Sequence, residues 1–126
     1  MTLDKDGFID TLEPNEVFVF GSNTAGRHGK GAALTALRKF GAVYGVGEGL
    51  RGQSYAFPTL NQHFRKVGFT DLARSRRRLY DTCIENLDKI FYMTKVGCGL
   101  AGFPEQDMKD IFQAHPGNLV LPEDWR

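Results

Sequence analysis

The segment EVFVFGSNTAGRHGKGAALTALRKF, residues 16–40, combines a strand pattern, a glycine-rich loop and a helix pattern in direct succession. Residues 17–20 are continuously apolar and favour β structure, which is typical of a strand buried on both faces in a helix-covered sheet. After the loop, apolar residues recur at helical spacing at Ala33, Ala36, Leu37 and Phe40. Gly41 suits the position just after a helix, so the segment predicts a helix over residues 31–40.

A second unit of the same kind begins at residue 90. Residues 90–96 predict a strand that enters another glycine loop, GCGLAG at 97–102. Pro104 at a first helical position, with acidic residues in the first turn, predicts a third helix. The residues expected to share its inner face are Met108, Ile111, Phe112 and His115. Pro116 and Gly117 then end the helix, and residues 119–121 predict a last strand.

The part of the chain between these units predicts one more strand and one long helix. Residues 41–52 include five glycines and read as a loop, after which residues 54–57 predict a short strand closed by Pro58. Thr70 is a candidate cap for a helix over residues 70–87. The apolar stripe expected on this helix consists of Leu72, Leu79, Cys83 and Leu87, widened by Ala73 and Tyr80.

Strands that alternate with helices predict an α/β fold. We expect a single domain over residues 1–126, a three-layer α/β/α sandwich around a mixed, mainly parallel sheet. Sheets of this kind bind ligands at the carboxyl ends of their strands, where both glycine loops would lie. Backbone N–H groups and helix N-termini at that edge favour a phosphate.

Composition excludes several classes of protein. The formal net charge of +1 argues against binding nucleic acid through a strongly basic overall field. Two cysteines, Cys83 and Cys98, show neither a CxxC pattern nor a metal-ligand spacing, which favours a reducing compartment. No apolar run approaches the length of a membrane span, and the acidic start MTLDKDGFID does not resemble a signal peptide. We therefore expect a cytoplasmic protein without a membrane partner.

Two common phosphate-binding motifs do not fit the first loop. A P-loop requires Ser or Thr after Gly-Lys, but Gly31 follows Gly29-Lys30. The dinucleotide fingerprint GxGxxG is half met by Gly29 and Gly31, while Leu34 occupies the place of its last glycine. The loop therefore does not predict classical binding of ATP or NAD.

The two glycine loops resemble those of the macrodomain family, whose members bind ADP-ribose. FGSN at 20–23 followed by GKGAA at 29–33 is similar to the family's first ligand loop, and KVGCGLAGF at 95–103 is similar to its second. Together with YAFPT at 55–59, these segments follow the family's order of elements over most of the chain. The most similar branch includes ADP-ribosyl-ester hydrolases, but Ala101 stands where that branch has an aspartate.

The resemblance implies that ADP-ribose or a derivative binds with its diphosphate on the two loops. No lysine follows YAFPT at a matching place, and the family's adenine-contacting aspartate has no clear match, with Asp10 in GFID as a weak candidate. Neither a metal nor a cofactor is expected. The expected ligand-binding residues are Ser22, Asn23, Gly29, Gly31, Ala32, Gly97, Gly99, Leu100, Ala101 and Gly102.

If the protein is an enzyme, we expect hydrolysis at the distal ribose, with removal of a 1″-phosphate or of an ADP-ribosyl group. Asn23 offers a donor and an acceptor to a ribose hydroxyl, and His28 can transfer a proton at neutral pH. These two residues are the catalytic candidates. A turn role for Asn23 and an exposed, idle loop position for His28 are the alternatives.

Other chemically active side chains have simpler structural explanations. Cys98 is a possible nucleophile, but a small buried side chain is the better interpretation because no histidine partner is evident. Glu105 could orient water, but we favour the helix dipole as its explanation. Trp125 could cover an adenine, but we expect it to pin the C-terminal tail. His63 and His115 receive no role.

The basic run RSRRR at 74–78 supports an alternative function as a nucleic-acid-associated binding module, in which Arg74, Arg77 and Arg78 would contact phosphates. On a helix, however, Arg77 and Arg78 could pair with Asp81, which favours a solvated surface. Arg76 would lie nearer the apolar stripe and extend across it.

Overall fold

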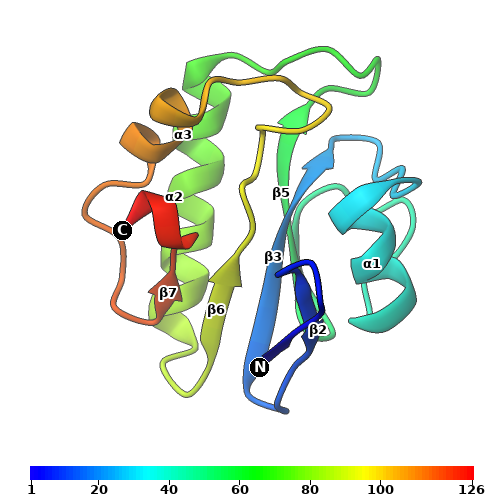
Figure 1. Cartoon of the computed structure of the whole chain (residues 1–126). Helices are drawn as coiled ribbons and strands as arrows, with labels where there is room; N and C mark the ends of the chain where they lie inside the picture. Colours follow the sequence, from blue (N-terminus) through cyan, green and yellow to red (C-terminus); the bar gives the residue numbers. More distant parts are fainter.

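The computed structural model describes all residues from 1 to 126, and it confirms the α/β fold (Figure 1). A five-stranded sheet has the order β4-β5-β3-β6-β7, and only β4 runs antiparallel to its neighbour. Its strands are β4 (Gly49–Arg51), β5 (Ser54–Leu60), β3 (Glu16–Asn23), β6 (Ile90–Met93) and β7 (Leu119–Val120). Helices on both faces make this a three-layer α/β/α sandwich.

The central strand β3 explains the two-sided core. Successive side chains of a strand point to opposite faces, so Val17 and Val19 pack on one side while Phe18 and Phe20 pack on the other. All four are at most 3% exposed. The continuous apolar run therefore reflects burial by helices on both faces, as the sequence predicts.

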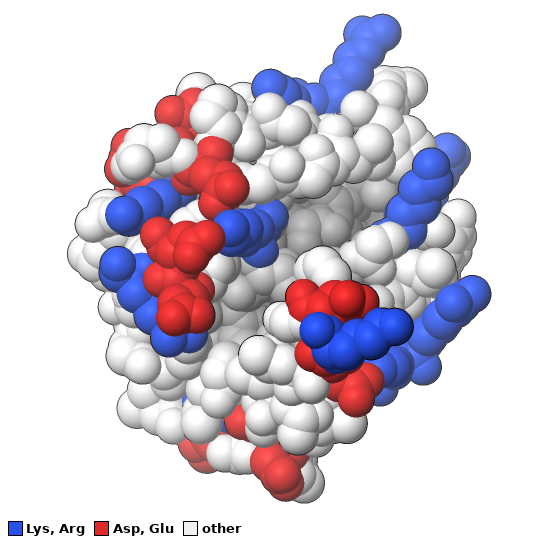
Figure 2. Space-filling model, in the orientation of Figure 1, with Lys and Arg blue, Asp and Glu red and all other residues white.

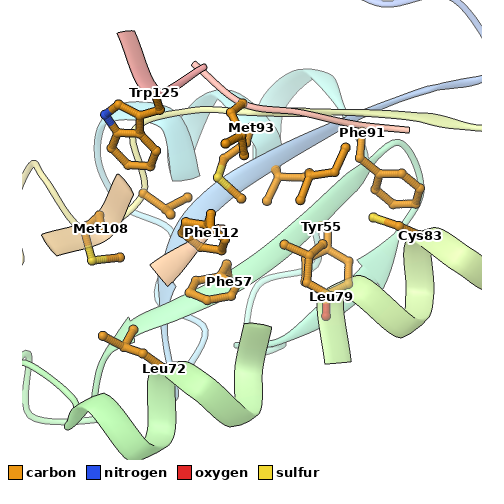
Figure 3. Packing of buried hydrophobic residues seen from close by; sticks show 14 of the residues in the cluster. Tyr55, Phe57, Leu72, Leu79, Cys83, Phe91, Met93, Met108, Phe112 and Trp125 are labelled. Carbon is orange, nitrogen blue, oxygen red and sulfur yellow. The ribbon is translucent and has the colours of Figure 1, made fainter. Parts of the chain in front are cut away.

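The larger core lies between the sheet and the helices α2 (Phe69–Glu85) and α3 (Glu105–Ile111), together with the 3-10 turn η1 (Glu123–Trp125). Figure 3 shows side chains of α2, such as Leu72 and Leu79, facing rings and sulfur atoms from the strands and from Phe112. The cluster comprises 18 buried residues. These contacts fix the second glycine loop, which joins β6 to α3.

The opposite face carries the helix α1 (Gly31–Lys39) and a smaller core of six buried residues. Ala36 packs with Phe18 and Phe20 in this core. The ring of Phe40 packs on that of Phe18, with 5.0 Å between the two centroids. Gly41 has φ of +79°, which agrees with its predicted place just after the helix. The smaller core positions α1 directly after the first glycine loop.

Several element boundaries differ from the sequence predictions. The strand β5 continues through Pro58 to Leu60. The pairing with β4 extends only from Ser54 to Ala56, so the rest of β5 lies at a sheet edge, where proline is tolerated. β4 itself lies in the predicted loop 41–52. β6 ends at Met93, so the predicted strand 90–96 was three residues too long. The last strand lacks Leu121.

The helix α2 begins earlier and ends earlier than predicted. Its cap is Gly68, whose N–H donates to Asp71 Oδ2 at 3.2 Å, and Thr70 lies inside the helix. Leu87 lies beyond the helix and is 74% exposed, and Ala73 is also exposed. Ser75 takes a place in the buried stripe instead. The predicted stripe was therefore right at its centre and wrong at its margins.

The helix α3 and the N-terminus also correct the predictions. Pro104 precedes α3 as its cap residue, and His115 lies exposed beyond its end. A short hairpin formed by β1 (Thr2–Leu3) and β2 (Ile9–Thr11) was not predicted. Asp10 of β2 pairs with Lys39 at 2.7 Å, which ties the hairpin to the end of α1.

Candidate ligand-binding site

One large cavity opens at the carboxyl ends of the parallel strands. It has a volume of about 1240 Å³ and is lined by Ser22 at the end of β3, Thr59 at the end of β5, and Thr94 just after β6. In Figure 2 a hollow is visible near the centre of the face in view. Both glycine loops contribute to the same cavity, because residues 29–31 and 97–99 are all among its lining.

The first loop presents free backbone donors to the cavity. The N–H groups of Gly29, Gly31 and Ala32 donate to no acceptor in the protein. The helix α1 has no side-chain cap at Lys30 and no acidic residue in its first turn. By contrast, α2 is capped by Asp71 and α3 carries two acids in its first turn. The N-terminus of α1 therefore combines positive potential with unpaired donors beside the cavity.

Packing against the larger core fixes the shape of the second loop. Gly97 has φ of +80°, and a Cβ there would lie 3.0 Å from Met108 Cε. A Cβ on Gly21 at the end of β3 would lie 3.4 Å from the Gly97 nitrogen, so glycine lets strand and loop approach closely. The N–H groups of Gly97, Gly99 and Leu100 donate to no acceptor in the protein.

Two glycines of the cavity lining have no internal reason to be glycine. At Gly29 and Gly99, φ is not in the left-handed region, and an added Cβ would meet no atom within 4 Å. Both residues line the cavity, and both N–H groups are unpaired. A ligand that touches the backbone at these two points would explain the absence of a Cβ.

The side chain of Asn23 holds the first loop together. Its Oδ1 accepts from the Arg27 N–H at 3.0 Å, and its Nδ2 donates to the Arg27 carbonyl at 3.0 Å. Asn23 lines the cavity but is 6% exposed. The structure thus gives Asn23 the turn-forming contacts considered as the alternative to ligand binding, with one further donor and acceptor site on the amide remaining.

His28 is buried behind the cavity wall. It is 1% exposed, so the exposed, idle position considered from the sequence is wrong. Its ring meets Phe20 edge to face at 5.2 Å between centroids, and its Nε2 lies 3.2 Å from Ser22 Oγ. Ser22 Oγ also donates to the Asn23 carbonyl at 3.2 Å, so the hydroxyl lies between the ring and the backbone at the end of β3.

This arrangement keeps His28 neutral. Burial lowers the pKa of the ring below its ordinary value, and Nδ1 has no partner in the protein. Ser22, not His28, reaches the cavity. The chemical role that the geometry gives His28 is to hold Ser22 Oγ and the first loop in place.

The charges of the lining are mainly positive. Arg27, Lys30 and Arg38 line the cavity and take part in no ion pair. Lys95, on the side of the second loop, is neutralised by Glu105 at 3.0 Å and Asp124 at 2.8 Å. The excess of positive charge thus lies on the α1 side of the cavity, where the free N–H groups of the first loop also point.

Three residues with alternative roles are engaged within the protein. Burial raises the pKa of the Cys98 thiol, which disfavours a thiolate nucleophile. The hydrogen bond from Lys95 lowers the pKa of Glu105, which also accepts from Trp125 Nε1 at 3.2 Å. Trp125 is 3% exposed and stacks on Phe112, so it pins the C-terminal tail as predicted.

Most of the residues predicted from the loops face the cavity, while two lie outside its lining. Gly102 and His28 are the two exceptions. The lining residues are Ser22, Asn23, Gly29, Gly31, Ala32, Gly97, Gly99, Leu100 and Ala101. Leu100 is 75% exposed at the rim, whereas Ala101 is buried.

Sequence reasoning missed the aromatic and basic residues of the cavity. Phe8 and Phe64 line it from the N-terminal hairpin and from the loop after β5. No local pattern marks either residue. Arg27 and Lys30 stand within the quoted first loop, and their positive charge was a signal that could have been used.

The basic run on α2 is largely engaged elsewhere. Arg78 pairs with Glu48 at 2.8 Å and not with Asp81, and Arg76 donates to the Ile111 carbonyl at 2.9 Å. The predicted pair between Arg77 and Asp81 does not form. None of these arginines lines the large cavity.

No group of three or more His, Cys, Asp or Glu side chains is arranged to hold a metal ion. The structure contains no helix with the length and hydrophobicity that a bilayer crossing requires.

Comparison with protein-family models and with curated proteins finds no match. Among solved structures, the chain is similar to a structural-genomics crystal structure of a protein from Bacteroides thetaiotaomicron. The TM-score is 0.61 at 14% sequence identity, and the alignment covers 90% of this chain and 92% of that chain. At this level of identity the likeness concerns the fold alone, and it extends over nearly the whole α/β domain.

Proposed function

We propose that the protein binds ADP-ribose or a close derivative, with the diphosphate held between the two glycine loops. The observation that carries the proposal is the pair Gly29 and Gly99. Both have an unpaired N–H, both face one cavity, and neither needs to be glycine for the fold. A diphosphate has two charged groups that can accept from donors on opposite sides of such a cavity.

Charge and size agree with this ligand class. The uncapped N-terminus of α1 and the unpaired cations Arg27, Lys30 and Arg38 favour an anion. A cavity of about 1240 Å³ has room for a nucleotide-sized molecule, since small-molecule sites typically span roughly 300–1,000 Å³. The arginines of α2 lie outside this cavity, and of the three in the nucleic-acid alternative Arg78 is paired with Glu48.

Hydrolysis at the distal ribose is a second part of the proposal, and it requires turnover of the bound ligand. Ser22 is a buried hydroxyl that lines the cavity, and its Oγ lies 3.2 Å from His28 Nε2. Incubation with ADP-ribose 1″-phosphate and with an ADP-ribosylated protein measures this directly. Release of phosphate or of ADP-ribose identifies a hydrolase, and binding without release identifies a reader of ADP-ribose.

Alanine substitution at the two glycines tests binding. We expect Gly29→Ala and Gly99→Ala to leave the melting temperature unchanged, because their Cβ atoms meet no protein atom. Each should weaken ADP-ribose binding by about 10- to 100-fold, because the added Cβ would keep the ligand from reaching the backbone N–H, and one charge-assisted hydrogen bond is worth roughly 1.5–3 kcal/mol. Isothermal titration calorimetry measures the affinities.

Gly117→Ala is the matched control. Gly117 is also open and free of positive φ, but it lies outside the cavity lining. If Gly117→Ala weakens binding as much, or if Gly29→Ala and Gly99→Ala do not weaken it, the loops do not contact the ligand. Titration with a short RNA at several salt concentrations is the second control, because binding through phosphate contacts on a surface is steeply salt-dependent.

A further inference from the structure

Phe64 is an exposed aromatic ring held in an unfavourable backbone conformation at the cavity rim. Its φ is +59°, in the left-handed region that residues with a Cβ rarely adopt. The side chain is 43% exposed and lines the cavity. Strain of this kind persists only where the surrounding structure imposes it, and it is concentrated at functional sites.

The turn that holds Phe64 is built around Asn61. The Asn61 Oδ1 accepts from the N–H groups of His63 at 2.8 Å and Arg65 at 3.1 Å. The Asn61 N–H donates to the Arg65 carbonyl, and the Phe64 N–H donates to the Asn61 carbonyl. These four bonds fix the backbone while the ring stays out of both hydrophobic cores.

Arg27 completes a platform with Phe64. Its guanidinium carbon lies over the ring, 5.9 Å from the centroid, and it takes part in no ion pair. Arg27 also lines the cavity, and its backbone is fixed by Asn23. A guanidinium plane next to an aromatic ring is a surface on which a planar heteroaromatic ring stacks.

A second exposed ring lies toward the other end of the cavity. Phe8 is 71% exposed, and its hairpin is tied to the C-terminal end of α1 through Asp10 and Lys39. Arg27 precedes the N-terminal end of the same helix, which is about 13 Å long. Between these ends the free N–H groups of Gly29–Ala32 line the cavity.

We propose that Phe64 and Arg27 form a second ring-binding subsite, so that the ligand carries a planar ring at each end of its diphosphate. The inference rests on the proposed function. Of the exposed rings in the lining, Tyr44 lies against His28, and ADP-ribose, which has only its adenine ring, would leave either Phe8 or Phe64 uncovered. The chemical class that covers both is a dinucleoside diphosphate, in which a second base is joined to the sugar beyond the diphosphate. The volume of about 1240 Å³ accommodates this longer molecule.

Calorimetric titration with P1,P2-diadenosine diphosphate and with ADP-ribose tests the subsite. Stacking of one base on an aromatic side chain predicts that the wild-type protein binds the dinucleotide about tenfold more tightly. Phe64→Leu should abolish this difference and leave ADP-ribose affinity within about twofold of wild type. Phe69→Leu is the matched control, since Phe69 is 61% exposed but lies outside the cavity lining.

Phe64→Gly separates binding from folding. Glycine adopts the left-handed conformation without strain, so the melting temperature should equal or exceed that of wild type while the tenfold preference disappears. Equal affinities of the wild-type protein for the two ligands, or a preference that survives both Phe64 variants, would reject the subsite alone. If ADP-ribose itself does not bind, the proposed function and the subsite fail together.

Discussion

At the residue scale, His28 shows how burial changes the use of a titratable side chain. Its ring is enclosed by Phe20 and Tyr44, and its single hydrogen bond supports Ser22. Protonation would place a charge in this apolar surrounding, where Nδ1 finds no acceptor. The lowered pKa follows from the burial of the ring.

We expect His28 to make stability depend on pH. The ordinary pKa of a histidine is 6.5, and the folded pKa is lower, so the unfolded state binds the proton first as the pH falls. The contribution of His28 to the free energy of unfolding is therefore largest above about pH 6.5. It decreases as the pH falls below this value, until the pKa of the folded state is reached. Urea unfolding of the wild-type protein and of His28→Gln between pH 5 and 7.5 measures the effect.

The variant His28→Gln should be less stable at neutral pH but should lose less stability on acidification than the wild type. His63→Gln is the control, because His63 is exposed and belongs to neither core. A parallel decline of wild type and His28→Gln with falling pH would show that His28 does not titrate on unfolding.

At the scale of elements, the first glycine loop is supported by a second loop that the sequence predicts only as irregular. The Gly45 N–H donates to the Gly26 carbonyl at 2.8 Å. A Cβ on Gly26 would lie 2.4 Å from the Gly45 carbonyl carbon, and a Cβ on Gly47 would lie 2.4 Å from the Asn23 carbonyl oxygen. Gly26 in the first loop and Gly47 in residues 41–52 thus allow the two loops to pack closely on each other.

Gly26→Ala is expected to be strongly destabilising. Its φ of +69° and the backbone of Gly45 both oppose a Cβ, so the free energy of unfolding should fall by about 2–4 kcal/mol. Chemical denaturation measures the change, with Gly29→Ala as the open-space comparison three residues away. A Gly26→Ala protein as stable as Gly29→Ala would mean that the two loops are not packed as described.

Element boundaries were harder to predict than the elements themselves. The helix α1 was predicted to within one residue, because its apolar spacing and Gly41 are local signals. The continuation of β5 through Pro58 depends on where β4 stops, and the cap of α2 depends on a contact between Gly68 and Asp71. Such contacts cannot be inferred from propensity alone.

At the scale of the whole molecule, the two faces of the sheet are unequally packed. The face covered by α2 and α3 buries 18 hydrophobic residues, whereas the face covered by α1 buries six. The first glycine loop therefore leads into the less strongly held helix. Elements with few buried apolar contacts open at lower free energy than the rest of a domain.

Hydrogen exchange should report this difference. We expect the free energy of opening measured for the amides of α1 to be lower than that for the amides of α2. If opening of α1 abolishes binding, ADP-ribose at 100 times its dissociation constant should raise the α1 opening free energy by about 2.7 kcal/mol. Amides of α1 that exchange as slowly as those of α2, or that gain no protection from bound ADP-ribose, would contradict this account.

The sequence by itself determined the α/β class, the succession of β3, α1, β5, α2, β6, α3 and β7, and the position of both glycine loops after strands, but not the hairpin β1–β2 or β4. These features depend on hydrophobic periodicity and on glycine, which act over a few neighbouring residues. Only the tertiary structure decided that both loops line one cavity, that His28 lies behind Ser22, and that Phe64 stands at the rim. The reason is that strand order and contacts between distant segments bring these groups together, and neither is encoded in local spacing.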